Sequence, residues 1–134
     1  MKYLISLLFT LLVSSDLHKE SVSTVDMVEV INENIAEARH YYLHNWKILR
    51  EQAIEKGYIE SYQFIEMEPT ETVPLSFMLI TTYKDIDQYN QAEGHFIELI
   101  EAKGSLDLLN DKKPNEFRRT IYSKGPLKSI AHKQ

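Results

Sequence analysis

Two histidines four residues apart stand in the longest helical stretch that the sequence predicts. His40 and His44 have the spacing at which two imidazoles on one helix can hold the same metal ion. Neither neighbour of His40 is a glutamate, so the motif of a zinc-protease helix is absent. At helical periodicity the pair falls opposite the apolar stripe, among charged residues. We therefore predict a solvated helix face and no metal site; a surface zinc site completed by Glu37 or Glu51 is the alternative.

A second group of side chains lies along the apolar stripe of the same helix and could bind a small molecule. Tyr42 and Trp46 are one helical turn apart, and Arg39 and Asn45 flank them. Aromatic rings with a few convergent polar groups are typical of small-molecule pockets. His95, on the flank of a later helix, could reach the edge of the same pocket. We predict ligand binding by these five residues; in the alternative, the rings are core, Arg39 extends to solvent and His95 is a surface or interface residue.

Other chemistries lack the residues that they need. The chain has no cysteine, which excludes disulfides, thiolate metal sites and a cysteine nucleophile. Its 4 glycines are scattered, so there is no glycine-rich phosphate loop. No serine stands in a nucleophile-elbow pattern. We expect no cofactor, and the sequence leaves open whether the protein is an enzyme.

Hydrophobic periodicity and turn residues predict the elements that position these side chains. Asn32 or Asn34 should cap the first helix and Gly57 should end it. Asp85 should cap the second helix, with Gln88 at the capping-box position. The predicted segments are a strand at 24–31, a helix to about residue 56, strands at 60–67 and 75–83, and a helix from 85 to Gly104. The second helix should bury one face made of Ile86, Tyr89, Phe96, Leu99, Ile100 and Lys103. Residues 114–122 are either a short helix or a strand, and 127–133 is predicted as the last strand.

This order of elements predicts an α+β fold of the ferredoxin-like split βαβ type, with a four-stranded antiparallel sheet and helices on one face. The strand predicted at 75–83 is apolar on both faces: Leu75, Phe77, Leu79 and Tyr83 on one, Met78 and Ile80 on the other. A strand of this kind is covered on both sides. Since the chain is too short to cover the second face, a second copy is the simplest cover, and we expect a homodimer.

The first residues are predicted to be a signal peptide. A single early charge, Lys2, precedes an apolar run from Tyr3 to Val13, and Val13 and Ser15 are small residues placed before a cleavage point. The run is too short to span a membrane as a helix. We expect cleavage near Ser15, a single domain from 16 to 134, periplasmic or secreted localisation and no membrane span after cleavage; an uncleaved anchor is the alternative.

Charge is distributed unevenly along the chain. Residues 16–111 carry 19 acidic and 7 basic residues, whereas residues 112–134 carry 7 basic residues against Glu116 alone. Because phosphate contacts need a basic face, so acidic a domain is not expected to bind nucleic acid. The basic C-terminal segment, 112–134, either neutralises the acidic body or docks on an anionic partner.

Four stretches carry a resemblance to a known group of proteins: VDMVEV, HYYLHNWKILREQ, FMLITTY and DIDQYNQAEGHF. Over about residues 24–104 the chain resembles the dimeric α/β-barrel superfamily, which includes antibiotic-biosynthesis-monooxygenase-like proteins, and more narrowly a set of small secreted bacterial proteins of unknown function. The resemblance implies two ferredoxin-like subunits packed sheet to sheet and a ligand cleft between helices and sheet. The Asn, Trp and His of haem-degrading members have no residue-by-residue counterparts here.

From these observations we expect an exported homodimer that binds a small apolar or aromatic molecule between helices and sheet. One alternative is a cofactor-free oxygenase or isomerase, with Asn45 or His95 as the polar group beside a substrate held on Tyr42 and Trp46. A structural partner protein is the other alternative.

Overall fold

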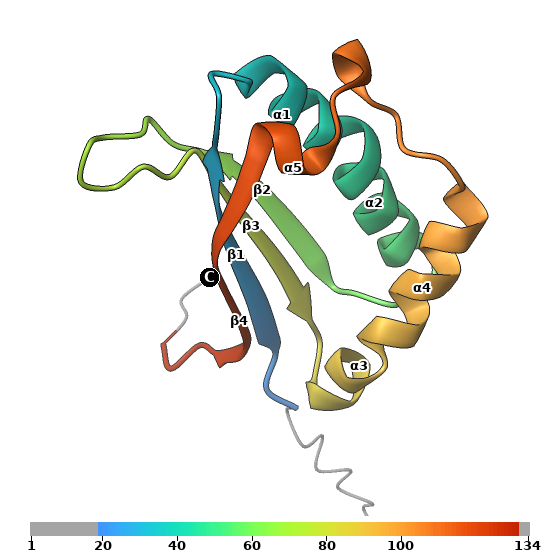
Figure 1. Ribbon diagram of the computed structural model, residues 1–134. Coiled ribbons are helices and arrows are strands. Elements are labelled where there is room, and N and C mark those ends of the chain that lie inside the picture. The colour runs from blue at the N-terminus through green and yellow to red at the C-terminus, as the bar shows by residue number, and fades with distance from the viewer. Residues whose placement is uncertain (1–18, 132–134) are drawn as a thin grey trace, which may run out of the picture.

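Four strands form a single antiparallel sheet in the computed structural model, which describes residues 19–131. The strands are β1 (Val22–Val30), β2 (Ser61–Glu66), β3 (Phe77–Tyr83) and β4 (Arg118–Lys128), in the order β2-β3-β1-β4. Each neighbouring pair is antiparallel. The helices lie on one face of this sheet (Figure 1). The prediction of an α+β fold with a four-stranded antiparallel sheet is therefore confirmed.

The first helical rod runs from Ile35 to Glu55, as α1 (Ile35–Tyr41), a π-helical segment η1 (Tyr42–Trp46) and α2 (Lys47–Glu55). Gly57 follows its end with φ 71°, a left-handed conformation that suits glycine. The later helices are α3 (Ile86–Asn90), α4 (Ala92–Lys103), the 3-10 turn η2 (Leu109–Asp111) and α5 (Pro114–Phe117). The predicted rod and its glycine stop are both present.

Strand β3 alternates between buried and half-buried residues along its whole length. Phe77, Leu79 and Tyr83 are buried under the helices, whereas Met78 and Ile80 point to the other face. No helix of residues 19–131 covers that second face (Figure 1). The predicted two-sided apolar strand is therefore present, and its second face, the open face, is apolar and half-exposed.

Strand β4 corrects the prediction for the end of the chain. The last strand was expected at 127–133, but β4 begins at Arg118 and ends at Lys128; residues 132–134 lie outside the described part. Residues 114–122 supply both alternatives, a helical turn to Phe117 and then the strand. The physical reason is that one edge of β1 has no other strand beside it. Strand β4 pairs with this edge along the full length of β1, from Val22 to Val30, and therefore begins earlier in the chain.

The start of the first helix also differs from the prediction. Neither candidate caps it: Asn34 stands at the N-cap position without a side-chain cap hydrogen bond. Instead, the Nδ2 atoms of Asn32 and Asn34 donate to the Glu116 carbonyl, at 3.0 and 2.9 Å. Asn34 Oδ1 also accepts from Lys112 Nζ at 2.5 Å. These side chains attach the C-terminal segment to the turn after β1, a use that only the tertiary contact creates.

The second helix begins as predicted but is not continuous. Asp85 Oδ1 accepts from Gln88 N at 2.8 Å, while Gln88 Oε1 accepts from Lys84 N at 2.8 Å, one residue before the expected capping-box partner. A turn at Gln91 then separates α3 from α4. Ile86 is 43% and Ile100 52% exposed, so the predicted buried face is wrong at both positions. The break at Gln91 changes the direction in which the side chains of α4 point relative to those of α3. The residues predicted to share one face therefore do not all point to the core.

The basic C-terminal segment forms ion pairs with the acidic body. Lys112 Nζ lies 3.3 Å from Glu37 Oε1, and Arg119 Nη2 lies 2.5 Å from Glu29 Oε2. The predicted signal peptide, 1–15, lies outside the described residues. Within the described residues, the helices are all too short or too polar to cross a membrane.

Candidate functional site

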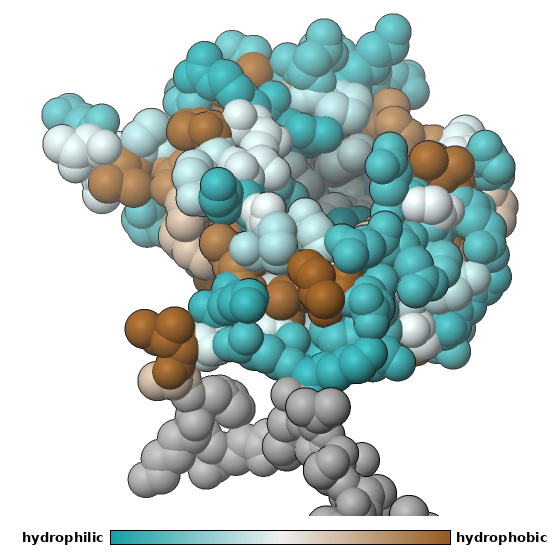
Figure 2. All heavy atoms as spheres, turned by 90° about the horizontal axis from the view of Figure 1, so that it is seen from below, coloured by the Kyte–Doolittle hydropathy of each residue, from teal (hydrophilic) through white to brown (hydrophobic). Residues whose placement is uncertain are grey.

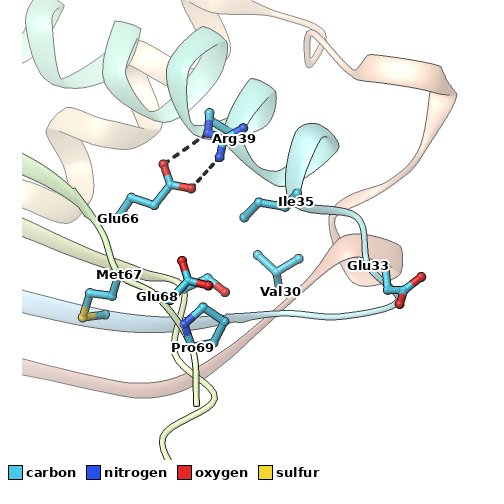
Figure 3. Close-up of a pocket in the computed structure, with 9 residues that line it drawn as sticks. Val30, Glu33, Ile35, Arg39, Glu66, Met67, Glu68 and Pro69 are labelled. Carbon is cyan, nitrogen blue, oxygen red and sulfur yellow. Dashed lines mark hydrogen bonds and ion pairs between the residues drawn. The ribbon is translucent and has the colours of Figure 1, made fainter. Parts of the chain in front are cut away.

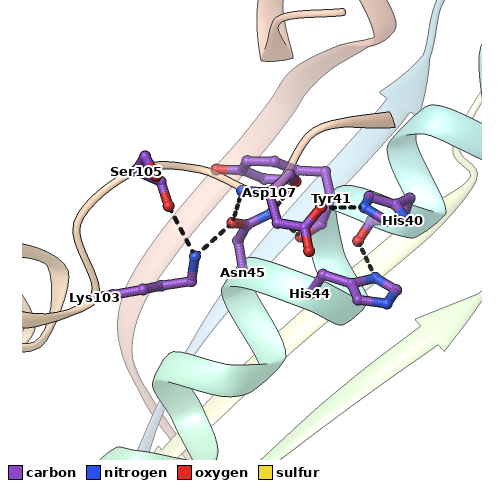
Figure 4. Close-up of polar contacts among 7 residues, drawn as sticks. All are labelled: His40, Tyr41, His44, Asn45, Lys103, Ser105 and Asp107. Atoms are coloured by element: carbon purple, nitrogen blue, oxygen red, sulfur yellow. Dashed lines mark hydrogen bonds and ion pairs between the residues drawn. The ribbon is translucent and has the colours of Figure 1, made fainter. Parts of the chain in front are cut away.

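Asn45 lies at the centre of a closed hydrogen-bond network between the first helical rod and the loop after α4 (Figure 4). Its Nδ2 donates to the carbonyls of Tyr41 (3.0 Å) and Asp107 (2.7 Å). Its Oδ1 accepts from Lys103 Nζ and Asp107 N, each at 2.8 Å. An amide has two N–H donors and two acceptor positions, so this side chain is fully satisfied. Asn45, predicted as a ligand group, instead fixes the loop, and with 1% exposure it has no free atom for a substrate.

The π-helical segment η1 follows from the same side chains. In an α-helix the Tyr41 carbonyl would accept from the backbone N–H of Asn45, but here it accepts from the Asn45 side chain. His44 Nδ1 lies 3.0 Å from the His40 carbonyl in the same way. Side chains that insert into the backbone ladder favour a local π-bulge, and such bulges occur frequently at functional sites.

His40 and His44 stack ring on ring, with centroids 4.0 Å apart and 17° between planes. His40 Nε2 also contacts Asp107 Oδ1 at 2.7 Å. The loop after α4 therefore covers His40, whereas His44 is exposed. The prediction that this helix face is solvated is confirmed for His44 and wrong for His40. Throughout residues 19–131, no group of three or more His, Cys, Asp or Glu side chains is close enough to hold a metal ion.

Arg39 lies at a pocket between α1 and the β2–β3 connection (Figure 3), and neither Asn45 nor Trp46 lines this pocket. Its guanidinium forms a bidentate pair with Glu66, with Nε–Oε2 at 3.2 Å and Nη2–Oε1 at 2.5 Å. This pocket holds about 560 Å³ and is also lined by Glu33 and Glu68. Because Glu66 neutralises the one arginine, an anion has little to bind here.

His95 belongs to a different hollow, about 260 Å³, that it lines with Lys19, Asp85 and Gln88. Its ring stacks on Tyr58 at 3.7 Å with 6° between planes. His95 Nδ1 is buried without a hydrogen-bond partner in the described chain. The structure thus separates His95 from the other predicted ligand residues.

Trp46 lines a cavity beside the first rod, which we call the central cavity. It holds about 200 Å³ and is lined by Tyr41, Asn45, Trp46, Leu49, Arg50, Ile100, Lys103, Gly104 and Leu106. Seen from below, the surface is hollowed between the side of the sheet and α4 (Figure 2). Tyr42, by contrast, is 2% exposed and packs on Phe64 and Phe77, so it belongs to the core. Of the five predicted residues, only Trp46 presents a free surface to this cavity.

Arg50 is the functional candidate that sequence reasoning missed. Its Cζ lies 4.4 Å from the Trp46 ring centroid and 4.2 Å from that of Phe96. With the described residues it makes a single long hydrogen bond, Nε to Thr81 Oγ1 at 3.4 Å, and no ion pair. Burial lowers the pKa of Arg50 to about 10, so it is charged at neutral pH. A desolvated guanidinium with free donors is available to an acceptor in the cavity.

A second arginine faces the same interior from the sheet. Arg118 Cζ lies 5.1 Å from the ring centroid of Tyr41, which also lines the central cavity. Its Nε is buried and without a hydrogen-bond partner in residues 19–131. Asp26, on the helix side of β1, accepts from Ser123 Oγ at 2.5 Å. The interior between helices and sheet thus combines two arginines with one aspartate.

Two sequence signals could have found these residues. Arg50 is four residues after Trp46 and three before Ala53, so it interrupts the apolar stripe of the helix with a charge. Asp26 interrupts an apolar strand in the same manner. A charge on a buried face is uncommon unless it is paired or functional.

Comparison with known proteins assigns neither a family nor a function to this chain. No protein-family model, no curated protein and no solved structure matches this chain. The candidate site is therefore defined by its own geometry.

Proposed function

We propose that this protein binds a small, largely apolar molecule in the central cavity. The observation that carries the proposal is Arg50, which lies beside Trp46 and Phe96 with most of its donors free. Burying a charge is costly unless it is paired. A bound ligand with an acceptor group offsets this cost, whereas a purely structural cavity does not.

The lining supports a binding site because it combines apolar surface with few polar groups. Leu49 and Trp46 form one wall, and Ile100 and Leu106 form the other. Ile100 and Leu106 are 52% and 48% exposed, so both leave apolar surface available for contact. A ligand between the walls would cover both.

Two features support an exported homodimer of ferredoxin-like subunits, the dimeric-barrel arrangement. The strand order β2-β3-β1-β4 with antiparallel neighbours fits the ferredoxin-like plan. The open face carries a contiguous apolar set, because residues directly opposite one another share a face: Val25, Met27, Ile65, Met78, Ile80 and Tyr122. Export, to the periplasm or outside the cell, is supported by the apolar run before residue 16.

An enzyme of the oxygenase or isomerase kind has less support. Asn45 is fully hydrogen-bonded within the protein and His95 lines a different hollow. The two groups that such a reaction was expected to use are therefore not directed at a substrate in the central cavity.

A cavity-filling variant tests the binding function. Ile100→Trp should occupy the central cavity, and Ile97→Trp is the matched control, since Ile97 is 49% exposed on the same helix and does not line the cavity. We expect fragment screening by ligand-observed NMR to find binders for the wild type and for Ile97→Trp, and none for Ile100→Trp. Binding that persists in Ile100→Trp, or no binder for the wild type, would contradict the proposal.

A further inference from the structure

The central cavity is positively charged inside a protein that is negatively charged overall. The whole chain carries a formal net charge of −5, yet the charged residues among those that line the cavity, Arg50 and Lys103, are both basic. Lys103, at the rim, already binds Asn45 Oδ1 and the Ser105 carbonyl. The positive interior is thus a local feature and not a consequence of composition.

Aromatic rings limit the directions from which the Arg50 guanidinium can be hydrated or can meet a hydrogen-bond acceptor. Trp46 and Phe96 occupy positions over it at 4.4 and 4.2 Å, where water would otherwise hydrate the cation. The five N–H donors of an arginine lie in the guanidinium plane as a fork that matches a carboxylate. Nε is directed at Thr81, which leaves the Nη donors. These Nη donors are open to an acceptor in the cavity that Arg50 lines.

We propose that the ligand of the central cavity is a small aromatic monocarboxylate whose carboxylate binds Arg50 and whose ring lies against Trp46 and Tyr41. This inference rests on the proposed binding function and names its ligand class. A single carboxylate matches Arg50, the guanidinium that lines the cavity with free Nη donors. The cavity, about 200 Å³, is smaller than the roughly 300–1,000 Å³ of sites for drug-sized ligands. Its apolar walls fit a ring.

Matched carboxylate and amide pairs test the ligand class. Benzoate, phenylacetate and indole-3-acetate would each be titrated against benzamide, phenylacetamide and indole-3-acetamide by NMR, which measures Kd for both members of a pair. In the wild type we expect at least one carboxylate to bind about tenfold or more tightly than its amide, because hydrogen bonds to charged groups are stronger than neutral ones.

Arginine variants assign the preference to a residue. Arg50→Met should remove the carboxylate preference and keep amide binding, whereas Arg119→Met, an exposed arginine on β4 paired with Glu29, should keep the preference. Arg50→Lys preserves the charge without the fork and should retain only part of the preference; it also serves if Arg50→Met does not fold, as judged by circular dichroism.

Each outcome separates the two proposals. Carboxylates and amides that bind equally to the wild type overturn the ligand class and leave the binding function standing. A carboxylate preference that survives in Arg50→Met or is undiminished in Arg50→Lys overturns the role of Arg50. Absence of any binding by all six compounds overturns the ligand class, while the binding function is then judged by the fragment screen with Ile100→Trp.

Discussion

Asn45 illustrates how one buried polar side chain can hold two segments together. It forms four hydrogen bonds to Tyr41, Lys103 and Asp107, three of them to residues near the end of α4. Asp107 lies on the loop after α4, which borders the central cavity through Leu106. Together with the contact between His40 and Asp107, this amide fixes the position of the loop.

Truncation of Asn45 should destabilise the protein measurably. Asn45→Ala removes three hydrogen bonds to part-buried backbone groups of Tyr41 and Asp107, and a typical hydrogen bond contributes about 0.5–1.5 kcal/mol. We expect a loss of about 2 kcal/mol or more in the free energy of unfolding, measured with urea. Asn90→Ala, at an exposed position on α3, is the control and should change it by less than about 0.5 kcal/mol. Equal effects of the two changes would show that the network is not formed.

Glu37 makes stability depend on acid pH. A hydrogen bond from Asn110 Nδ2 (3.1 Å), together with Lys112, lowers the pKa of Glu37 below its ordinary value of 4.5. A carboxyl whose folded pKa is lowered stabilises the protein above its unfolded pKa, and this contribution is lost as pH falls through the folded pKa. Glu37→Gln should therefore be less stable than the wild type at pH 7, and the difference should shrink below about pH 4.

Urea unfolding at several pH values between 3 and 7 measures this difference. Glu55→Gln, on the exposed side of α2, is the control and should follow the wild type more closely. If the gap between Glu37→Gln and the wild type is constant over this range, the carboxylate does not have the proposed linkage.

At the level of elements, α4 is packed against the rest of the protein through little of its surface. Leu99 is 2% exposed and belongs to a buried cluster with Leu49 and Ala53, whereas its neighbour Ile100 is 52% exposed. The helix contacts α2, and its other side borders the central cavity. This arrangement leaves the central cavity beside a helix that contributes little to the core.

Truncations of two neighbouring residues on α4 should lower the free energy of unfolding by very different amounts. Leu99→Ala should cost about 2–5 kcal/mol because it empties a buried site. Ile100→Ala should cost less than about 1 kcal/mol without a ligand, as exposed substitutions usually do. Thermal or urea unfolding of the two variants measures both values. Similar losses would place Ile100 in the core and exclude it from a cavity wall.

For the whole molecule, the open face of the sheet is the feature that a monomer leaves unexplained. Met27 and Met78 are paired across β1 and β3 on this face, next to Val25 and Ile80. Contiguous exposed apolar surface of this kind is typical of interfaces. A second copy would bury the same patch on both subunits, as two-fold symmetry requires.

A charge on the open face tests the homodimer. We expect the wild type to sediment as a dimer at micromolar concentration and Met78→Asp to be monomeric or unstable, since a dimer would bury an unpaired carboxylate. Lys84→Asp, exposed just beyond the end of β3, is the control and should remain dimeric. A monomeric wild type, or a stable dimer of Met78→Asp, would show that this face is not the interface.

The sequence by itself determined the helical rod with its Gly57 stop, the two-sided strand β3 and the antiparallel α+β arrangement. These features depend on local periodicity, on turn residues and on the pairing plan that follows from them. Local periodicity could not determine the phase of α4 after the turn at Gln91, nor the end of the chain, where β4 is selected by the free edge of β1.

Only the tertiary structure decided which polar residues meet. Asn45 and Arg39 were predicted together, yet the first binds Asp107 and the second Glu66, each a distant residue in the chain. Arg50 acquires its environment from Phe96 and Thr81, which belong to other elements. Long side chains are positioned by whichever partner the fold brings within a few ångströms. Helical spacing fixes their direction from the backbone but not that partner.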